Sequence, residues 1–350
     1  KRAAIMSKYR NIVWFLKAMQ EYTRGGYETA SRNFLAKDLS VNLDGQSFMI
    51  TGANSGIGKA TAMAIAKKGG TVHMVCRNKE RAESAREDIV KEAGNNNIHV
   101  HILDLSETRK VWEFAEDFKS KHTSLNVLIN NAGSMLNIRE VNFEGLEKNF
   151  AINTLGVYIL TKGLIPLLEK NTEPRVITVS SGGMLVQKLR ITDLQTEKRM
   201  FDSTMVYAQN KRQQVVMTEE WARTYPRIHF SVMHPGWADT PAVVMAMPQL
   251  YESLRCRLRT PEQGADTVIW LAVSPAAART PSGKFFQDRR MVPVHLPLAW
   301  TRYSREKARA LMVRLETLAK RIQPSGGRSQ LNSPAIETTG SLQDCIKKAA

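Results

Sequence analysis

The sequence predicts an α/β fold, with a doubly wound parallel sheet in a single domain and basic extensions at both ends of the chain. Apolar runs of strand length alternate with helical patterns from about residue 45 to 290. The first strand-to-helix junction is a glycine-rich turn at 51–58. The chain has 350 residues, of which 43% are hydrophobic, so it can bury one large core. We therefore expect an extension at 1–44, a domain at 45–290 and a second extension at 291–350.

The glycine turn follows an apolar run that ends at Phe48-Met49-Ile50 and precedes a helical stretch at 59–66. Gly52 can adopt backbone angles that are closed to other residues. Gly56 and Gly58 lack a Cβ, so a cofactor can approach and the helix can pack tightly. The helix N-terminus presents free N–H groups to phosphates. This Rossmann-type arrangement predicts a dinucleotide site, although a tight turn needs glycine in any case. Its candidate residues are Thr51, Gly52, Asn54, Ser55, Gly56, Ile57 and Gly58.

The predicted second strand, 71–76, is followed by Arg77. Enzymes that use NAD usually carry an acidic residue about 20 residues after the turn, where it binds the ribose 2′-hydroxyl. A guanidinium in this place suits a 2′-phosphate. Arg77 therefore favours NADP over NAD, and the alternative is a solvated surface arginine.

The next elements carry polar residues at strand ends and inside a helix. A charged helix at 79–93 precedes the third strand, 98–103. Asp104 follows this strand, and an aspartate in such a place is most often the cap of the next helix. A buried strand at 125–129 ends in Asn130-Asn131-Ala132-Gly133, where small residues allow close approach and the amides can bond neighbouring strands. Asn153 lies in an otherwise apolar helix and needs a partner.

A further buried strand, 176–179, ends in Ser180-Ser181. A polar insertion at about 187–203 follows, and a helix then begins near Met205. Tyr207 and Lys211 are four residues apart in it, so they share one face of the helix. This pair is common by chance, but it is a strong signal after a serine-ended strand and a glycine turn.

The remaining elements complete the predicted domain. The sixth strand, 228–233, leads into Pro235-Gly236 and then Thr240. An apolar region at 241–258, a helix at 265–273 and a strand at 284–286 follow. Beyond the domain, a basic amphipathic helix is expected at 305–322, and disorder from about 324.

Together these motifs resemble the short-chain dehydrogenase/reductase family over roughly residues 45–290: T-G-x-x-x-G-x-G, N-N-A-G, the serine with Y-x-x-x-K, and P-G-x-x-x-T. The resemblance implies an NADP(H)-dependent interconversion of a carbonyl and an alcohol. The implied catalytic residues are Asn153, Ser181, Tyr207 and Lys211. The further cofactor-binding residues implied are Arg77, Asp104, Leu105, Asn131, Ala132, Gly133, Tyr207, Lys211, Pro235, Gly236 and Thr240.

The resemblance also assigns roles. Tyr207 would transfer the proton, while Lys211 and the positive nicotinamide would favour its phenolate. Ser181 would hold the substrate oxygen, and Asn153 would position a water. The region at 241–258 would form a lid, whose apolar content suggests a lipophilic substrate such as a retinoid, steroid or lipid aldehyde. The insertion before Tyr207 is longer than in the shortest members and resembles that of retinol-dehydrogenase-like members.

Two other function classes compete with an oxidoreductase. A cofactor-binding regulator or scaffold without turnover would share the fold, but the complete set of four catalytic residues argues against it. The net charge of +17 suggests nucleic acid. However, residues 1–40 hold eight Lys or Arg against three acids, and 289–350 hold twelve against four. The middle is nearly balanced, and no nucleic-acid-binding signature is present.

Cysteine and histidine usage points to neither disulfides nor a metal. Cys76, Cys256 and Cys345 are far apart, which fits a reducing compartment inside the cell. His99 and His101 share one face of a strand without a visible third ligand, so we interpret them as ordinary strand residues.

The first twenty residues carry five Lys or Arg and no acid. No secretory signal is evident, and the apolar run is too short to span a bilayer. Three alternatives stay open: contact with an anionic membrane surface, a mitochondrial presequence, or docking on the enzyme body. We therefore expect a cytoplasmic, peripheral membrane or mitochondrial location. The sequence is also compatible with assembly into a homo-oligomer. Residues 25–44 are polar and predicted to be irregular. The apolar stripe, if helical, consists of Ile5, Tyr9, Ile12, Val13, Leu16 and Met19.

Overall fold

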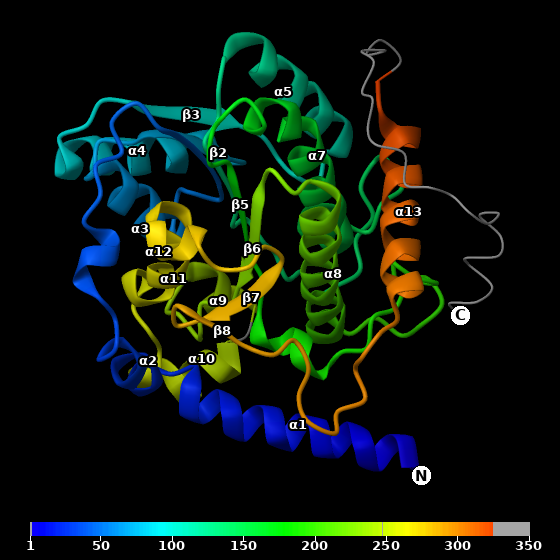
Figure 1. Cartoon of the computed structure of the whole chain (residues 1–350). Coiled ribbons are helices and arrows are strands. Elements are labelled where there is room, and N and C mark those ends of the chain that lie inside the picture. The colour runs from blue at the N-terminus through cyan, green and yellow to red at the C-terminus, as the bar shows by residue number, and fades with distance from the viewer. Residues whose placement is uncertain (1, 247, 325–350) are drawn as a thin grey trace.

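The structure, a computed structural model, describes residues 2–246 and 248–324. At its centre lies an eight-stranded sheet in the order β3-β2-β1-β4-β5-β6-β7-β8. The first seven strands pair in parallel, and β8 runs antiparallel to β7. This is the single-domain, doubly wound Rossmann-type sheet that the sequence predicts (Figure 1). The strands are β1 (Ser47–Thr51), β2 (Thr71–Cys76), β3 (Ile98–Ile102), β4 (Val127–Asn130), β5 (Arg175–Val179), β6 (His229–Met233), β7 (Lys284–Gln287) and β8 (Arg290–Met291).

The chain reverses its direction of travel across the sheet between β1 and β4, which are neighbours. In such a sheet, ligands bind outside the carboxyl ends of the strands at this switch point. The glycine turn leaves β1 there, and Asn131-Ala132-Gly133 leaves β4 beside it. The central strands are buried on both faces, which explains their unbroken apolar runs.

Two helical layers cover the sheet (Figure 1). One face is packed by α3 (Gly56–Ala66), α4 (Lys79–Ala93), α11 (Pro261–Val273) and α12 (Pro275–Ala278). The other is packed by α5 (Thr108–Lys121), α7 (Gly156–Leu168) and α8 (Ser203–Thr224). Helix α13 (Arg305–Ile322) packs on the outer side of this layer, against α5 and α8. Their starts follow local signals, since Asn78, Asp202 and Ser304 cap α4, α8 and α13.

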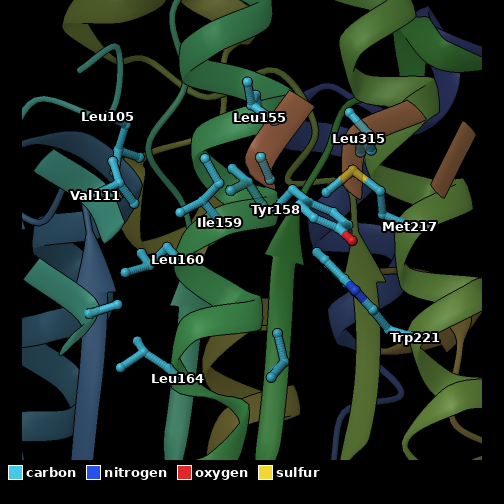
Figure 2. Close-up of a cluster of buried hydrophobic side chains, with 14 of the residues drawn as sticks. Leu105, Val111, Leu155, Tyr158, Ile159, Leu160, Leu164, Met217, Trp221 and Leu315 are labelled. Atoms are coloured by element: carbon cyan, nitrogen blue, oxygen red, sulfur yellow. The ribbon is translucent and has the colours of Figure 1, made fainter. Parts of the chain in front are cut away.

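The second layer encloses a core in which Tyr158 stacks on Trp221 with ring centroids 5.8 Å apart (Figure 2). The helix expected at 305–322 is α13, and it buries Leu311 and Leu315 in this core. The Tyr158 hydroxyl donates to Glu316 of α13 over 2.7 Å. This part of the C-terminal extension therefore packs as part of the domain. Predicted disorder from about 324 falls almost wholly on 325–350, outside the described residues.

A long apolar helix runs through this layer as α6 (Lys148–Phe150), a π-helical segment η2 (Ala151–Leu155) and α7. Its span Lys148–Leu168 is long and apolar enough to cross a membrane by length and composition. However, 83% of its most apolar window is buried within the protein. Burial against α5 and α8 accounts for this apolarity, as in the core helix of a globular domain.

The N-terminal segment contains more structure than the sequence predicts. It forms α1 (Arg2–Glu21), α2 (Arg24–Ser31) and a 3-10 turn, η1 (Ala36–Leu39). The expectation of an irregular 25–44 is therefore wrong for α2 and η1. Thr23 caps α2, and Trp270 of α11 donates to Asp38 of η1 over 3.0 Å. Contacts with the domain stabilise helices that are too short to persist alone.

Helix α1 docks on the domain mainly through residues outside the predicted stripe, although Val13 of that stripe packs against the buried cluster of Met184 and Leu185. Ile12 and Leu16 of that stripe are 61% and 64% exposed. Ala18 and Tyr22 are fully buried, and the Trp14 indole donates to the Gly182 carbonyl over 2.7 Å. The indole and phenol rings find partners on the domain that apolar spacing alone does not reveal.

The lid region also folds as helices: α9 (Pro241–Ala246), α10 (Pro248–Leu254) and a 3-10 turn η4 (Arg255–Arg257). In Figure 1 these elements lie above α1, at the end of the molecule opposite α5. A second 3-10 turn, η3 (Gly182–Val186), begins after β5 and contacts α1.

Candidate active site

The glycine turn has the geometry of a phosphate cradle. Gly52 and Gly56 have φ of +69° and +52°, in the left-handed region that favours glycine. A Cβ on Gly58 would lie 2.2 Å from the Gly52 carbonyl oxygen, so only glycine fits there. Ser55 is the N-cap of α3, yet its side chain makes no capping hydrogen bond within the described chain. The first N–H groups of α3 are therefore available to an anion, which fits a dinucleotide pyrophosphate.

Asn131 joins the ends of β1 and β4. Its Nδ2 donates to the Thr51 carbonyl over 2.9 Å and to the Gly52 carbonyl over 3.3 Å. The Thr51 hydroxyl accepts from the backbone N–H groups of Asn131 and Ala132, at 3.0 and 2.9 Å. The amide thus bonds a neighbouring strand, as the sequence predicts, and it holds the glycine turn open beside Ala132.

The segment after β6 returns to the same turn. A Cβ on Gly56 would lie 2.9 Å from the Thr240 methyl carbon, so Thr240 packs directly against the glycine turn. Gly236 has φ of +77°, and a Cβ there would lie 2.3 Å from the Arg259 Nε. The structure therefore places Thr240 beside the glycine turn, where the cofactor is predicted to bind. It also packs the Pro235-Gly236 peptide against the buried guanidinium of Arg259.

The outer strands β2 and β3 place the remaining cofactor candidates along their carboxyl ends. Arg77 is exposed directly after β2. Asp104 accepts the Ser106 N–H over 2.8 Å in a turn before α5. The N-cap of α5 is Glu107, so the expectation that Asp104 caps this helix is wrong. Leu105 is buried and packs against α7, where a Cβ on Gly156 would lie 2.6 Å from the Leu105 carbonyl oxygen.

Asn153 lies in the π-helical segment and is held at both ends of its amide. Its Nδ2 donates to the Ser134 carbonyl over 2.7 Å, and its Oδ1 accepts the Ser134 N–H over 2.9 Å. This gives the partner that a polar residue in an apolar helix requires. π-Helical turns are rare and occur frequently at functional sites.

Lys211 points from α8 toward the strand ends. Its Nζ donates to the Val179 carbonyl over 2.8 Å. A Cβ on Gly133 would lie 3.2 Å from this Nζ and 3.3 Å from the Asn153 Oδ1. The ammonium and the asparagine amide therefore both reach Gly133, which has no side chain to separate them.

Burial dominates the electrostatics of the pair on α8. It raises the pKa of Tyr207 to about 12 and lowers the pKa of Lys211 to about 7. The Lys211 Nζ lies 5.4 Å from the centroid of the Tyr207 ring. In the chain alone, burial therefore places the pKa of Tyr207 above its usual value, opposite to the lowering that was expected from Lys211.

Ser181 is the N-cap of η3, and its Oγ accepts the Gly183 N–H over 3.2 Å. The adjacent Gly182 N–H donates to Nδ1 of buried His234 over 2.9 Å. A Cβ on Gly182 would lie 2.6 Å from the ring of Tyr22. Sequence reasoning missed both His234 and Tyr22 as supports of this serine. His234 directly precedes the Pro235-Gly236 motif, which was the available signal.

Arg259, like His234 and Tyr22, is a buried residue that holds segments of the candidate site in place and that the sequence did not reveal. Its guanidinium is 1% exposed and pairs with Asp288 at 2.6 and 3.0 Å. It also donates to the carbonyls of Glu21 over 2.6 Å and Pro235 over 3.2 Å. The Arg259 side chain therefore connects the end of α1, the Pro235-Gly236 segment and the residue that follows β7.

His99 and His101 lie on β3 beside two further histidines, His73 of β2 and His122 at the end of α5. The Nδ1 of His73 and the Nε2 of His101 are 3.0 Å apart. Within residues 2–246 and 248–324, no group of three or more His, Cys, Asp or Glu is arranged to hold a metal ion. Phe118 stacks on His122 with ring centroids 4.0 Å apart, so the rings pack as an aromatic cluster.

Comparison with known proteins shows the family to which the chain is similar. The profile of the short chain dehydrogenase family matches residues 46–249. Dehydrogenase/reductase SDR family member 12 of Bos taurus is 61% identical over 318 residues, covering 91% of this chain and 100% of that protein. Retinol dehydrogenase 12 of Mus musculus is 34% identical over 257 residues, covering 71% and 79%. The crystal structure of an uncharacterised protein from Mycobacterium paratuberculosis has a TM-score of 0.65 at 26% identity, covering 82% of this chain and 97% of that one.

Proposed function

Because the chain belongs to the short-chain dehydrogenase/reductase family, we propose that it interconverts a carbonyl and an alcohol with NADP(H), on a lipophilic substrate. As a member of that family it is an oxidoreductase with a nicotinamide cofactor. The observation that supports the proposal most is the cluster at Gly133. There Lys211 and Asn153 lie together at the carboxyl ends of the strands, next to the glycine turn.

The four proposed catalytic residues, here called the tetrad, have separate roles in the reaction. They are Asn153, Ser181, Tyr207 and Lys211. When bound, the nicotinamide supplies or accepts the hydride. In reduction, the Tyr207 hydroxyl gives its proton to the carbonyl oxygen of the substrate, and in oxidation its phenolate removes the proton of the alcohol. The Ser181 hydroxyl holds the same oxygen and stabilises its developing charge. Lys211, with a pKa of about 7, exchanges protons readily near neutral pH, and Asn153 positions the water that relays them.

The preference for NADP rests on Arg77. Its exposed guanidinium follows β2, where an acid would be expected for NAD. Purified protein should bind NADPH more tightly than NADH in a fluorescence titration. Arg77→Asp should shrink or reverse that preference, because it removes a phosphate partner and adds repulsion. Equal affinity of the unchanged protein for both cofactors would exclude this role of Arg77.

The proposal of a lipophilic substrate is supported by the apolar lid region and by the names of the relatives. Met245 of α9 is 65% exposed, and Val244 beside it is also exposed. A relative at 34% identity carries the name of a retinol dehydrogenase. Retinoids, steroids and lipid aldehydes are the substrate classes that we propose to test first.

The testing experiment is a panel of these carbonyls with NADPH, scored by loss of NADPH absorbance. We expect turnover of at least one of them, and Tyr207→Phe should lower it by on the order of a hundredfold or more without loss of NADPH binding. Normal turnover by Tyr207→Phe would contradict the proposed acid–base role. Tight NADPH binding without turnover of any carbonyl would instead favour a cofactor-binding regulator.

We also propose that α1 touches an anionic membrane surface, which would place the protein at a membrane inside the cell. Ile12 and Leu16 are exposed together with Phe15 on α1. Leu298 and Trp300 are 70% and 68% exposed on a loop that α1 contacts, since Arg10 donates to the Ala299 carbonyl. Apolar side chains beside a basic helix suit such a surface.

Sedimentation with phosphatidylserine liposomes tests this contact. The Ile12→Ser, Leu16→Ser double variant should stay in the supernatant while the unchanged chain pellets at low salt. The matched control is Ile138→Ser, a change of an exposed apolar residue between β4 and α6, which should still pellet. If the unchanged chain fails to pellet, this surface does not bind membranes.

A further inference from the structure

Gln214 lies on the same face of α8 as the catalytic pair. It follows Tyr207 by seven residues and Lys211 by three, the spacing of one helical stripe. Its side chain is fully buried. A polar side chain that is fully buried needs a reason to be there, because leaving its groups unbonded is costly.

The amide of Gln214 reaches the backbone of the catalytic asparagine. Its Nε2 donates to the Asn153 carbonyl over 2.7 Å. This carbonyl belongs to the π-helical segment, in which the backbone hydrogen bonds depart from the α pattern. Asn153 is thus held at three points: twice through its side chain by Ser134, and once through its carbonyl by Gln214.

The oxygen of the Gln214 amide, Oε1, is buried and, unlike its nitrogen, has no hydrogen-bond partner among the described residues. Leaving a buried oxygen without a partner destabilises the folded protein. Such a group in a native structure calls for an explanation, and an ordered water is a common one.

We propose that Gln214 is a positioning residue of the reaction: it fixes the Asn153 carbonyl through Nε2 and accepts, through Oε1, a hydrogen bond from a water of the proton relay. The inference rests on the proposed function, because a relay has a purpose only where Tyr207 and Lys211 transfer protons. It adds to the tetrad a fifth side chain that acts through Asn153.

The neighbouring Gln213 provides a matched control. It is also buried, and its Oε1 accepts the Thr154 hydroxyl over 2.7 Å. It therefore bonds the next residue of the same π-helical segment, but through a side chain rather than through the Asn153 carbonyl. A variant of Gln213 loses a comparable amount of packing and bonding without touching the proposed relay.

The experiment compares Gln214→Met with Gln213→Met, using all-trans-retinal, NADPH and the full chain. Both variants should lower the melting temperature to a similar extent. Only Gln214→Met should lower kcat, by on the order of ten- to hundredfold, with a shifted pH profile and an unchanged Kd for NADPH. Gln214→Glu should regain kcat on the acidic side, because its protonated acid can donate the same bond to the Asn153 carbonyl.

Three outcomes would overturn the inference. Equal losses of kcat in the two methionine variants would show that Gln214 acts only through stability. An unchanged kcat and pH profile in Gln214→Met would exclude any role in the reaction. Absence of turnover by the unchanged chain with every carbonyl of the panel would overturn the proposed function itself and the role of Gln214 with it.

Discussion

Replacing Arg259 with methionine should destabilise the protein by about 3–5 kcal/mol, the usual cost of removing one partner of a buried ion pair. The reason is the Asp288 carboxylate, which is almost fully buried and would lose both of its bonds to the guanidinium. The carbonyls of Glu21 and Pro235 would lose donors as well. Methionine keeps most of the apolar volume, so the loss reports the charge and the hydrogen bonds rather than a cavity.

The assay is urea unfolding, supported by thermal melting. For a chain of this size, the destabilisation corresponds to a fall in melting temperature of roughly 4–7 °C. Arg257→Met is the matched control, since Arg257 is exposed two residues away and its loss should cost less than about 0.5 kcal/mol. NADPH affinity should fall in Arg259→Met alone, because the guanidinium supports the Pro235-Gly236 peptide.

A double variant separates charge from packing. Adding Asp288→Asn to Arg259→Met removes the orphaned carboxylate, and asparagine tolerates the φ of +49° at this position. The double variant should therefore be more stable than Arg259→Met. If Arg259→Met is no less stable than Arg257→Met, or if the double variant is the least stable of the three, the role assigned to the buried pair is refuted.

Two further predictions concern the glycine turn and the histidine cluster. Gly58→Ala should abolish NADPH binding in a fluorescence titration, because its Cβ would overlap the Gly52 carbonyl oxygen; retained affinity would contradict the cradle. Burial and neighbouring imidazoles lower the pKa of His73 to about 3 and of His101 to about 4, against 6.5 in the unfolded chain. The cluster thus contributes stability above about pH 6.5, and this is lost as the pH falls toward 4. His73→Phe should flatten the acid side of a melting-temperature profile, and an unchanged profile would exclude this cause.

Much of the fold follows from local sequence. Glycines at a turn and apolar runs between capped helices depend on near neighbours, so the doubly wound parallel sheet and the position of the glycine turn could be predicted. The structure confirms the strand at 71–76 and the helix at 79–93 with the predicted bounds. The short antiparallel strand β8 was missed, because two exposed residues carry no periodic signal.

The supports of the site could not be predicted, because they depend on long-range contacts. Arg259 meets Asp288 and Glu21 only after the chain has folded, and nothing in its surroundings marks it as buried. Most of the face through which α1 docks lies outside the predicted apolar stripe, since spacing cannot tell which aromatic residue finds a partner. The orphaned oxygen of Gln214 likewise appears only when the environment of the π-helical segment is known.

The central claim is a hydride transfer, and isotope labelling tests it most directly. NADPH carrying deuterium at C4 of the nicotinamide is incubated with the full chain and the carbonyls of the panel, and the alcohol products are analysed by mass spectrometry. The account predicts one deuterium on the carbinol carbon of at least one product, with far less label when Tyr207→Phe replaces the unchanged chain. Tight NADPH binding without label in any alcohol would contradict the account.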